Sequence, residues 1–173
     1  ASCLVGSEMG IRDRGYGPHA QQLQKIAPTM ELAFIDEEGQ PLAKVRSGLL
    51  GLAERLGKMA EARAHLAWFD QQLAQARDQL VAWRQQPLLV FTLLDERHVV
   101  ILGKRSLFGN VMQQLGIENA WQQQDSFWGT ATVGIEHLAK LPALRAVCLD
   151  HGDEGLRSRV SASPLWQALP FVR

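Results

Sequence analysis

The strongest constraint on this chain is one long apolar seam that no glycine or proline interrupts between Lys58 and Gln86. Eight apolar side chains recur three or four positions apart along it: Met59, Ala62, Leu66, Phe69, Leu73, Ala76, Leu80 and Trp83. That spacing places all of them on one face of a helix of about 27 residues, roughly 40 Å long. A helix of this length packs along an extended partner, crosses between two bodies, or forms a coiled coil.

The segments around this helix predict a mixed α/β arrangement rather than a coiled coil. The stretch 41–56 has helical apolar spacing and ends at Gly57, a residue type that often closes helices. After Pro87, strands are expected at the apolar runs 88–94, 98–102 and 144–150, and helices at 106–115 and 133–141. This alternation predicts a three-layer lobe with a largely parallel sheet, in which ligands bind at loops past the strand ends.

Composition argues against several classes of partner. The chain has 173 residues, of which 18 are basic and 18 acidic, so its formal net charge is zero. This charge balance therefore gives no electrostatic reason to expect a nucleic acid or an anionic membrane surface as the partner. No run of 18 apolar residues is present that could span a bilayer. Cys3 and Cys148 lie far apart in the sequence, so their pairing stays open, and a buried free Cys148 is the simpler expectation.

One loop carries two adjacent aromatic residues. The segment QDSFWGT places Phe127 and Trp128 between turn-forming residues. Aromatic side chains in a loop either pack into the core at a corner or offer a wide contact surface to a ligand. The spacing leaves both interpretations open for Trp128, and likewise for Tyr16, the only tyrosine, in the turn GYGP.

Seven short motifs occur in one order along the chain: GYGP, QPLAKVR, LGKRSLF, IENAWQ, FWGTATVGIEHLA, CLDHG and PLWQALPFVR. Together they resemble the periplasmic ferric-hydroxamate (ferrichrome-type) siderophore-binding proteins of ABC importers, from about Gly15 to Arg173. The resemblance implies an α/β fold of two lobes joined by one long rigid helix, with the ligand in a shallow cleft between them. Residues 1–14 do not fit it, because the family has an apolar strand where this chain has GIRDR.

The resemblance divides the chain into three parts. Residues 1–57 would be a remnant of the N-terminal lobe, 58–86 the connecting helix, and 87–173 most of the C-terminal three-layer α/β lobe. It also implies a chain truncated at both ends, with most of one lobe expected before Gly15 and a final strand and helix expected after Arg173. Because one continuous helix resists bending, only a small closure of the lobes is expected on binding.

The resemblance also assigns ligand-binding roles to aromatic residues. Tyr16 matches a cleft tyrosine whose phenol would donate a hydrogen bond to a hydroxamate oxygen. Trp128 matches a tryptophan on the facing lobe, whose indole would lie against the siderophore. Trp121 and Phe127 are neighbouring candidates. The family also uses a cleft arginine from the N-terminal lobe, for which this chain offers no counterpart.

The function implied by the resemblance is solute capture without bond-making chemistry. The protein would bind a ferric hydroxamate siderophore in the periplasm and deliver it, as a monomer, to the membrane permease of an ABC importer for iron uptake. No cofactor or metal ligand of its own is expected, because the chelator already coordinates the ferric iron. The family docks on its permease through one acidic residue on each lobe; Glu136 matches one, whereas Gln21 stands where the other lobe has an acid.

Two other functions stay open. A cobalamin- or haem-binding protein would share the fold. A metal-dependent hydrolase is less favoured: Asp95 and His98 follow one predicted strand, Asp150 and His151 follow another, and the two strand ends could meet on one face. Their spacing matches no strong metal motif, and the segment DERH is typical of a hairpin turn.

Overall fold

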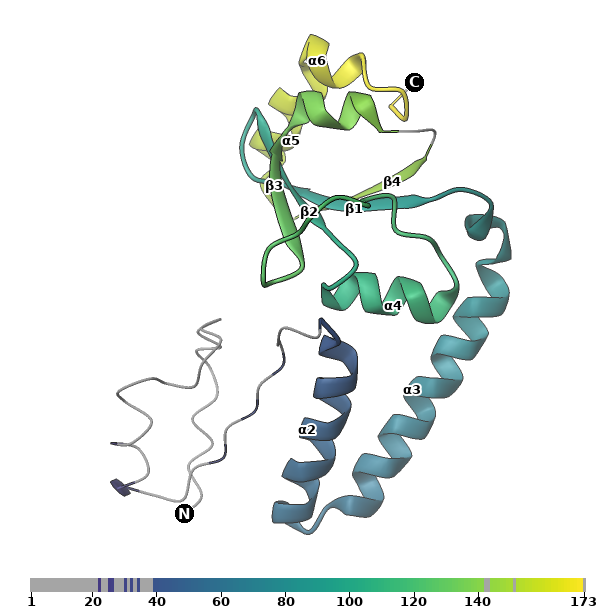
Figure 1. Cartoon of the computed structure of the whole chain (residues 1–173), viewed down its shortest axis with the longest axis vertical. Helices are drawn as coiled ribbons and strands as arrows, with labels where there is room; N and C mark the ends of the chain where they lie inside the picture. Colours follow the sequence, from purple (N-terminus) through teal and green to yellow (C-terminus); the bar gives the residue numbers. More distant parts are fainter. Residues whose placement is uncertain are drawn as a thin grey trace.

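The computed structural model describes residues 39–141, 144–150 and 152–172, together with positions 22, 25, 26, 30, 32 and 34. In these residues a sheet lies between two layers of helices, and a hairpin of two long helices extends away from it on one side (Figure 1). Most of the predicted remnant before position 39 therefore lies outside the described residues.

The helical hairpin consists of α2 (Pro41–Leu56) and α3 (Met59–Gln79). Proline opens α2, where a backbone N–H has no helical partner to lose. Gly57 ends that helix in the left-handed conformation, with a φ of 65°. Arg46 then joins the two helices, because its guanidinium donates to both carboxylate oxygens of Asp70 at 2.6 and 2.7 Å.

The apolar seam of α3 is confirmed, but the α-helix is shorter than expected. All eight seam residues are buried or partly buried, whereas every other residue between Met59 and Trp83 is exposed. The α-helix ends at Gln79, however, and a 3₁₀-helix, η1 (Val81–Gln85), follows it. The expectation of one uninterrupted α-helix over 58–86 is therefore wrong at its C-terminal end.

Side-chain hydrogen bonds account for this early end. Arg84 donates to the backbone carbonyl of Arg77, which would otherwise accept from the next turn of the helix. It also donates to the carbonyl of Leu115 at 3.1 Å. The N–H of Trp83 bonds to the carbonyl of Leu80 at 2.9 Å, which is the three-residue spacing of a 3₁₀ turn. With 21 residues, α3 is about 32 Å long rather than 40 Å.

The described strands form one four-stranded sheet in the order β3-β2-β1-β4. Their bounds are Leu88–Leu93 for β1, His98–Leu102 for β2, Thr130–Gly134 for β3 and Arg145–Leu149 for β4. Only β1 and β4 pair in parallel, whereas β1–β2 and β2–β3 are antiparallel. The expected largely parallel sheet is wrong for these strands, because the short connection 94–97 can close only a hairpin.

The sheet has a core on each face, which confirms the three-layer prediction. One face packs on η2 (Ile135–Lys140), α5 (Glu154–Ala162) and α6 (Pro164–Gln167), and the other on α3 and α4 (Leu107–Leu115). The side chains of β1 alternate between the two cores: Leu89 and Phe91 pack in one, and Leu88 and Val90 pack in the other. The unbroken apolar run of this strand thus reflects burial on both faces.

Two local expectations are corrected by the structure. Val133 and Gly134 were expected to begin a helix, but they pair with Val99 and His98 as the end of β3, and only a 3₁₀-helix follows. Cys148 was expected to be buried, but it is exposed on β4, since in the described residues only β1 pairs with this strand. None of the described helices is both long enough and apolar enough to cross a bilayer.

Candidate functional site

The candidate site is built on a tight turn at residues 126–130, called here the aromatic turn. The N–H of Ser126 donates to the carbonyl of Thr130 at 2.7 Å, and the N–H of Gly129 donates to the carbonyl of Ser126 at 2.9 Å. The hydroxyl oxygen of Ser126 accepts from the N–H groups of Trp128 and Thr130 at 3.2 and 3.3 Å. These bonds close the turn on itself and leave its two aromatic residues at the tip.

Phe127 and Trp128 form one aromatic unit at this tip. Their ring centroids are 5.4 Å apart and their planes are nearly perpendicular, at 88°. That edge-to-face arrangement is the favoured geometry for an aromatic pair. Both side chains are only partly buried, so the pair keeps an apolar face that a ligand can contact.

The turn is seated on the start of α4. The N–H of Gly103 donates to the carbonyl of Gly129 at 2.7 Å. Gly129 has a φ of 70°, and a β-carbon there would collide with the backbone nitrogen of Ser106, so only glycine allows this close approach. Ser106 is itself buried and caps α4 by accepting from the N–H of Gly109 at 3.0 Å.

Arg105 and Asp125 brace the turn from its N-terminal side. The Nε of Arg105 donates to the Asp125 carboxylate at 2.7 Å. One terminal nitrogen of the same guanidinium donates to the carbonyls of Asp125 and Ser126 at 3.0 and 2.8 Å. The Asp125 side chain is only 9% exposed, against 38% for Arg105, so the carboxylate is nearly enclosed and depends on this partner.

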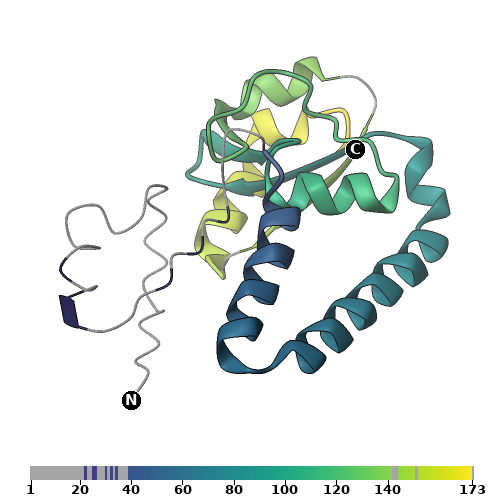
Figure 2. The same cartoon turned by 60° about the horizontal axis from the view of Figure 1, so that its bottom comes forward.

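The segment that leads into α2 lies beside the same region. Asn110, on α4, donates from its side-chain amide to the carbonyls of Gly39 and Lys104, both at 3.2 Å. Its side-chain oxygen accepts from the N–H of Leu42 at 3.4 Å. The start of α2 therefore abuts the start of α4, as the two views of the molecule show (Figures 1 and 2).

The predicted ligand residues have different placements. Tyr16 lies outside the described residues, so its position across from Trp128 stays a prediction. Phe127 and Trp128 lie together at the tip of the turn. Trp121 is 3% exposed and belongs to the core beneath η2, a placement typical of packing rather than of ligand contact.

The docking candidate Glu136 is exposed in the first turn of η2, 3.4 Å from the imidazole of His137. Gln21, the position that matches the docking acid of the other lobe, is outside the described residues.

The residues of the hydrolase alternative are tied to separate partners. In the β1–β2 hairpin, the Asp95 carboxylate lies 2.9 Å from the His98 ring and accepts from the N–H groups of Arg97 and His98 at 2.7 and 2.8 Å. The Arg97 N–H is the main cause that lowers the pKa of Asp95, and the His98 side chain adds to it. Asp150 instead accepts from Arg157 at 2.7 Å.

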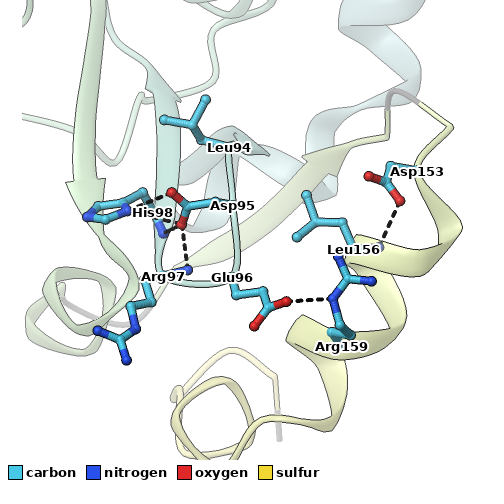
Figure 3. Close-up of a pocket in the computed structure, with 8 residues that line it drawn as sticks. All are labelled: Leu94, Asp95, Glu96, Arg97, His98, Asp153, Leu156 and Arg159. Carbon is cyan, nitrogen blue, oxygen red and sulfur yellow. Dashed lines mark hydrogen bonds and ion pairs between the residues drawn. The ribbon is translucent and has the colours of Figure 1, made fainter.

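A shallow pocket of about 420 Å³ lies between this hairpin and α5 (Figure 3). At its rim, the guanidinium of Arg159 donates to the Glu96 carboxylate at 2.5 Å. His151 lies outside the described residues, and within them no three acidic, histidine or cysteine side chains gather as a metal site would require. The pocket therefore offers compensated surface charges, not the open ligand cluster of a metal-dependent hydrolase.

Sequence reasoning missed the residues that support the aromatic turn. Arg105, Asp125 and Asn110 received no role, although Arg105 lies in the motif LGKRSLF that contributes to the resemblance. Their partners lie 20 and 71 positions away along the chain. The sequence shows Arg105 and Asp125 next to turn-forming residues. It does not show that these two charged side chains meet in the fold.

Comparison with known proteins confirms the resemblance. A family model described as "Periplasmic binding protein" matches residues 9–173. The iron(3+)-hydroxamate-binding protein FhuD of Escherichia coli (strain K12) is 38% identical over 159 residues, which are 92% of this chain and 53% of that protein. The ferric enterobactin-binding periplasmic protein FepB of Escherichia coli O6:H1 is 30% identical, over 88% of this chain and 48% of that protein.

Among solved structures, the siderophore-binding protein FhuD from Vibrio cholerae, bound to Fe3+-Desferal, matches with a TM-score of 0.79. It is 23% identical, and the match covers 89% of this chain and 58% of that one, so it establishes a shared fold. The chain spans about half the length of the curated relatives it matches. With nearly its whole length matched by the family model, the chain belongs to the periplasmic binding protein family.

Proposed function

We propose that this protein binds a ferric hydroxamate siderophore outside the cytoplasm, in the periplasm, and delivers it to the permease of an ABC importer. The observation that carries the proposal is 38% identity, over 92% of the chain, to a protein named for binding iron(3+)-hydroxamate. The fold shared with a Desferal-bound siderophore-binding protein supports it. The proposed role is binding and transfer by a monomer, with no chemical step.

The chemistry of the aromatic turn suits this kind of ligand. A ferric hydroxamate presents an oxygen-rich iron centre surrounded by methylene groups, and an exposed aromatic pair covers methylenes with little loss of side-chain entropy. Phe127 and Trp128 are held by backbone hydrogen bonds on both sides, so little ordering is needed on binding. In this proposal Tyr16 faces Trp128 and donates to a hydroxamate oxygen.

One observation favours a second ligand class. The chain is also 30% identical to a protein named for binding ferric enterobactin. A ferric chelate built on different oxygen donors would use the same aromatic surface but would not need the same hydrogen-bond donor. Only the shared fold supports cobalamin or haem as the ligand, and no described residue favours either.

The test is a titration of the purified chain followed by tryptophan fluorescence. Ferrichrome and ferrioxamine should quench the fluorescence saturably, and Trp128→Ala should weaken binding about tenfold or more, because it removes the largest ligand-facing side chain. Trp68→Ala is the matched control, since Trp68 is 53% exposed on α3 and far from the turn in the chain. Saturable binding of ferric enterobactin, cobalamin or haem, with no response to any hydroxamate, would refute the proposed ligand.

A further inference from the structure

We infer that Arg105 is a positioning residue that holds Trp128 in its binding orientation and ties the aromatic turn to the segment entering α2. The inference rests on the proposed function, because it concerns the same turn. It assigns to Arg105 no contact with the siderophore. Its role is exerted through Asp125 and Ser126, the two residues that directly precede the aromatic pair.

The first support is the number of acceptors that one guanidinium serves. Arg105 reaches the Asp125 carboxylate and two successive backbone carbonyls. Those carbonyls belong to the peptides that enter the turn, so their direction sets where residues 127 and 128 point. A planar guanidinium can hold three such acceptors at fixed angles, whereas an ammonium group offers a single point charge.

The second support is the fit around the carboxylate. A β-carbon on Gly103 would lie 2.6 Å from an Asp125 carboxylate oxygen, so this position has room for the carboxylate only because it is glycine. Without the guanidinium, a nearly enclosed charge would lose its cationic partner and keep only the backbone N–H of residue 105 at 3.5 Å, and Asp125 would move toward water to recover hydration. The turn that follows it in the chain would move as well.

The third support is the contact on the other side of Arg105. Its aliphatic stem packs against Gly39, where a β-carbon would lie 2.5 Å from the Cγ of Arg105. Gly39 has a φ of 65° and is held by Asn110 through its carbonyl. Arg105 therefore lies between the aromatic turn and the chain that leads into α2. Movement of either segment would be transmitted to the other through the side chain of Arg105.

The experiment compares Arg105→Ala, Arg105→Lys and Asp125→Asn with the unchanged chain. Fluorotryptophan labelling gives one fluorine resonance for each of the five tryptophans, and Trp128→Phe identifies the resonance of Trp128. In Arg105→Ala that resonance should shift or broaden while those of Trp83 and Trp166 stay in place. Ferrichrome should bind about tenfold more weakly, mainly through a faster dissociation rate, because the turn must be ordered on binding.

Controls separate positioning from general stability. Arg159→Ala breaks an exposed ion pair to Glu96 and should change neither the Trp128 resonance nor the affinity. Arg105→Lys should recover part of the affinity, and Asp125→Asn should reproduce the change in the resonance if Arg105→Ala folds poorly. An unchanged Trp128 resonance and unchanged affinity in both Arg105→Ala and Asp125→Asn would overturn the inference. If the unchanged chain binds no ferric chelate, the proposed function fails, while the fluorine spectra still decide whether Arg105 orients Trp128.

Discussion

The side-chain amide of Asn110 and the backbone carbonyl of Gly39 are joined by a buried hydrogen bond of 3.2 Å, across 71 positions of sequence. Asn110 is 8% exposed and also binds Lys104 and Leu42. One side chain thus connects the start of α2, the start of α4 and the loop that supports the aromatic turn. Asn110 thus attaches the α2 end of the helical hairpin to the α/β lobe, while α3 packs on the sheet through Leu73, Ala76 and Leu80.

Asn110→Ala should lower the free energy of unfolding by about 2 kcal/mol, because it removes three side-chain hydrogen bonds to backbone groups, one of them fully buried. Urea denaturation followed by circular dichroism measures the change. Gln113→Ala, at an exposed position of the same helix, should stay within about 0.5 kcal/mol. Equal effects of the two substitutions would show that the hydrogen bonds of Asn110 contribute nothing specific.

Phe91→Ala should be among the most destabilising single changes. Phe91 is 1% exposed at the centre of β1 and contacts Trp166 with ring centroids 5.9 Å apart. Removing a buried ring from a packed core costs about 3–5 kcal/mol. A denaturation midpoint close to that of the unchanged chain would contradict the placement of β1 between two cores.

The hairpin carboxylate of Asp95 should titrate below its ordinary pKa of 3.8, because N–H groups and the His98 side chain favour its charged form. A lowered pKa stabilises the hairpin at every pH above 3.8, and this stabilisation is lost as the pH falls through the lower, folded-state value. The amide resonances of Arg97 and His98 report the titration in NMR spectra. A midpoint at or above 3.8 would contradict the hydrogen bonds of the hairpin.

Cys148 should react slowly with thiol reagents although its residue is exposed. Partial burial of the sulfur raises the pKa of the thiol above its ordinary value of 9.0; a hydrogen bond with the backbone of Leu93 opposes this shift, and the charge of Asp150 adds to it. The reactive thiolate is therefore scarce at neutral pH. Measured in a Cys3→Ser variant, the rate at pH 8 should fall below that of free cysteine and rise steeply above pH 9. A fast rate at pH 7 would show an accessible, acidic thiol instead.

Glu136→Ala should weaken docking on the permease without changing siderophore affinity. The carboxylate is exposed at the start of η2, more than half accessible to solvent at 57%, as a docking charge must be. With ferrichrome-loaded protein and a reconstituted permease, the concentration that gives half-maximal ATPase stimulation should rise about tenfold. Glu118→Ala is the control at another exposed carboxylate. No difference between the two variants would remove Glu136 from the docking surface.

The local elements follow from the sequence alone, because their signals are local. The three- and four-residue spacing of the seam predicted which face of α3 is buried. The glycines that end α2 and α4, Gly57 and Gly116, adopt the left-handed conformation that their positions indicated. The apolar run from Leu88 predicted a strand buried on both faces. The motifs, in their order along the chain, also indicated the family.

How these elements meet depends on long-range contacts in the folded molecule. The segment DERH indicated the hairpin between β1 and β2, but the antiparallel pairing of β3 with β2 and the parallel pairing of β4 with β1 join strands far apart in the chain. The end of α3 depends on Arg84, whose acceptors lie on two different helices. The support of Trp128 by Arg105 and Asp125 depends on a contact between residues 20 positions apart. Such contacts arise from packing in three dimensions, and no period or turn signal in the chain encodes which side chains will pair.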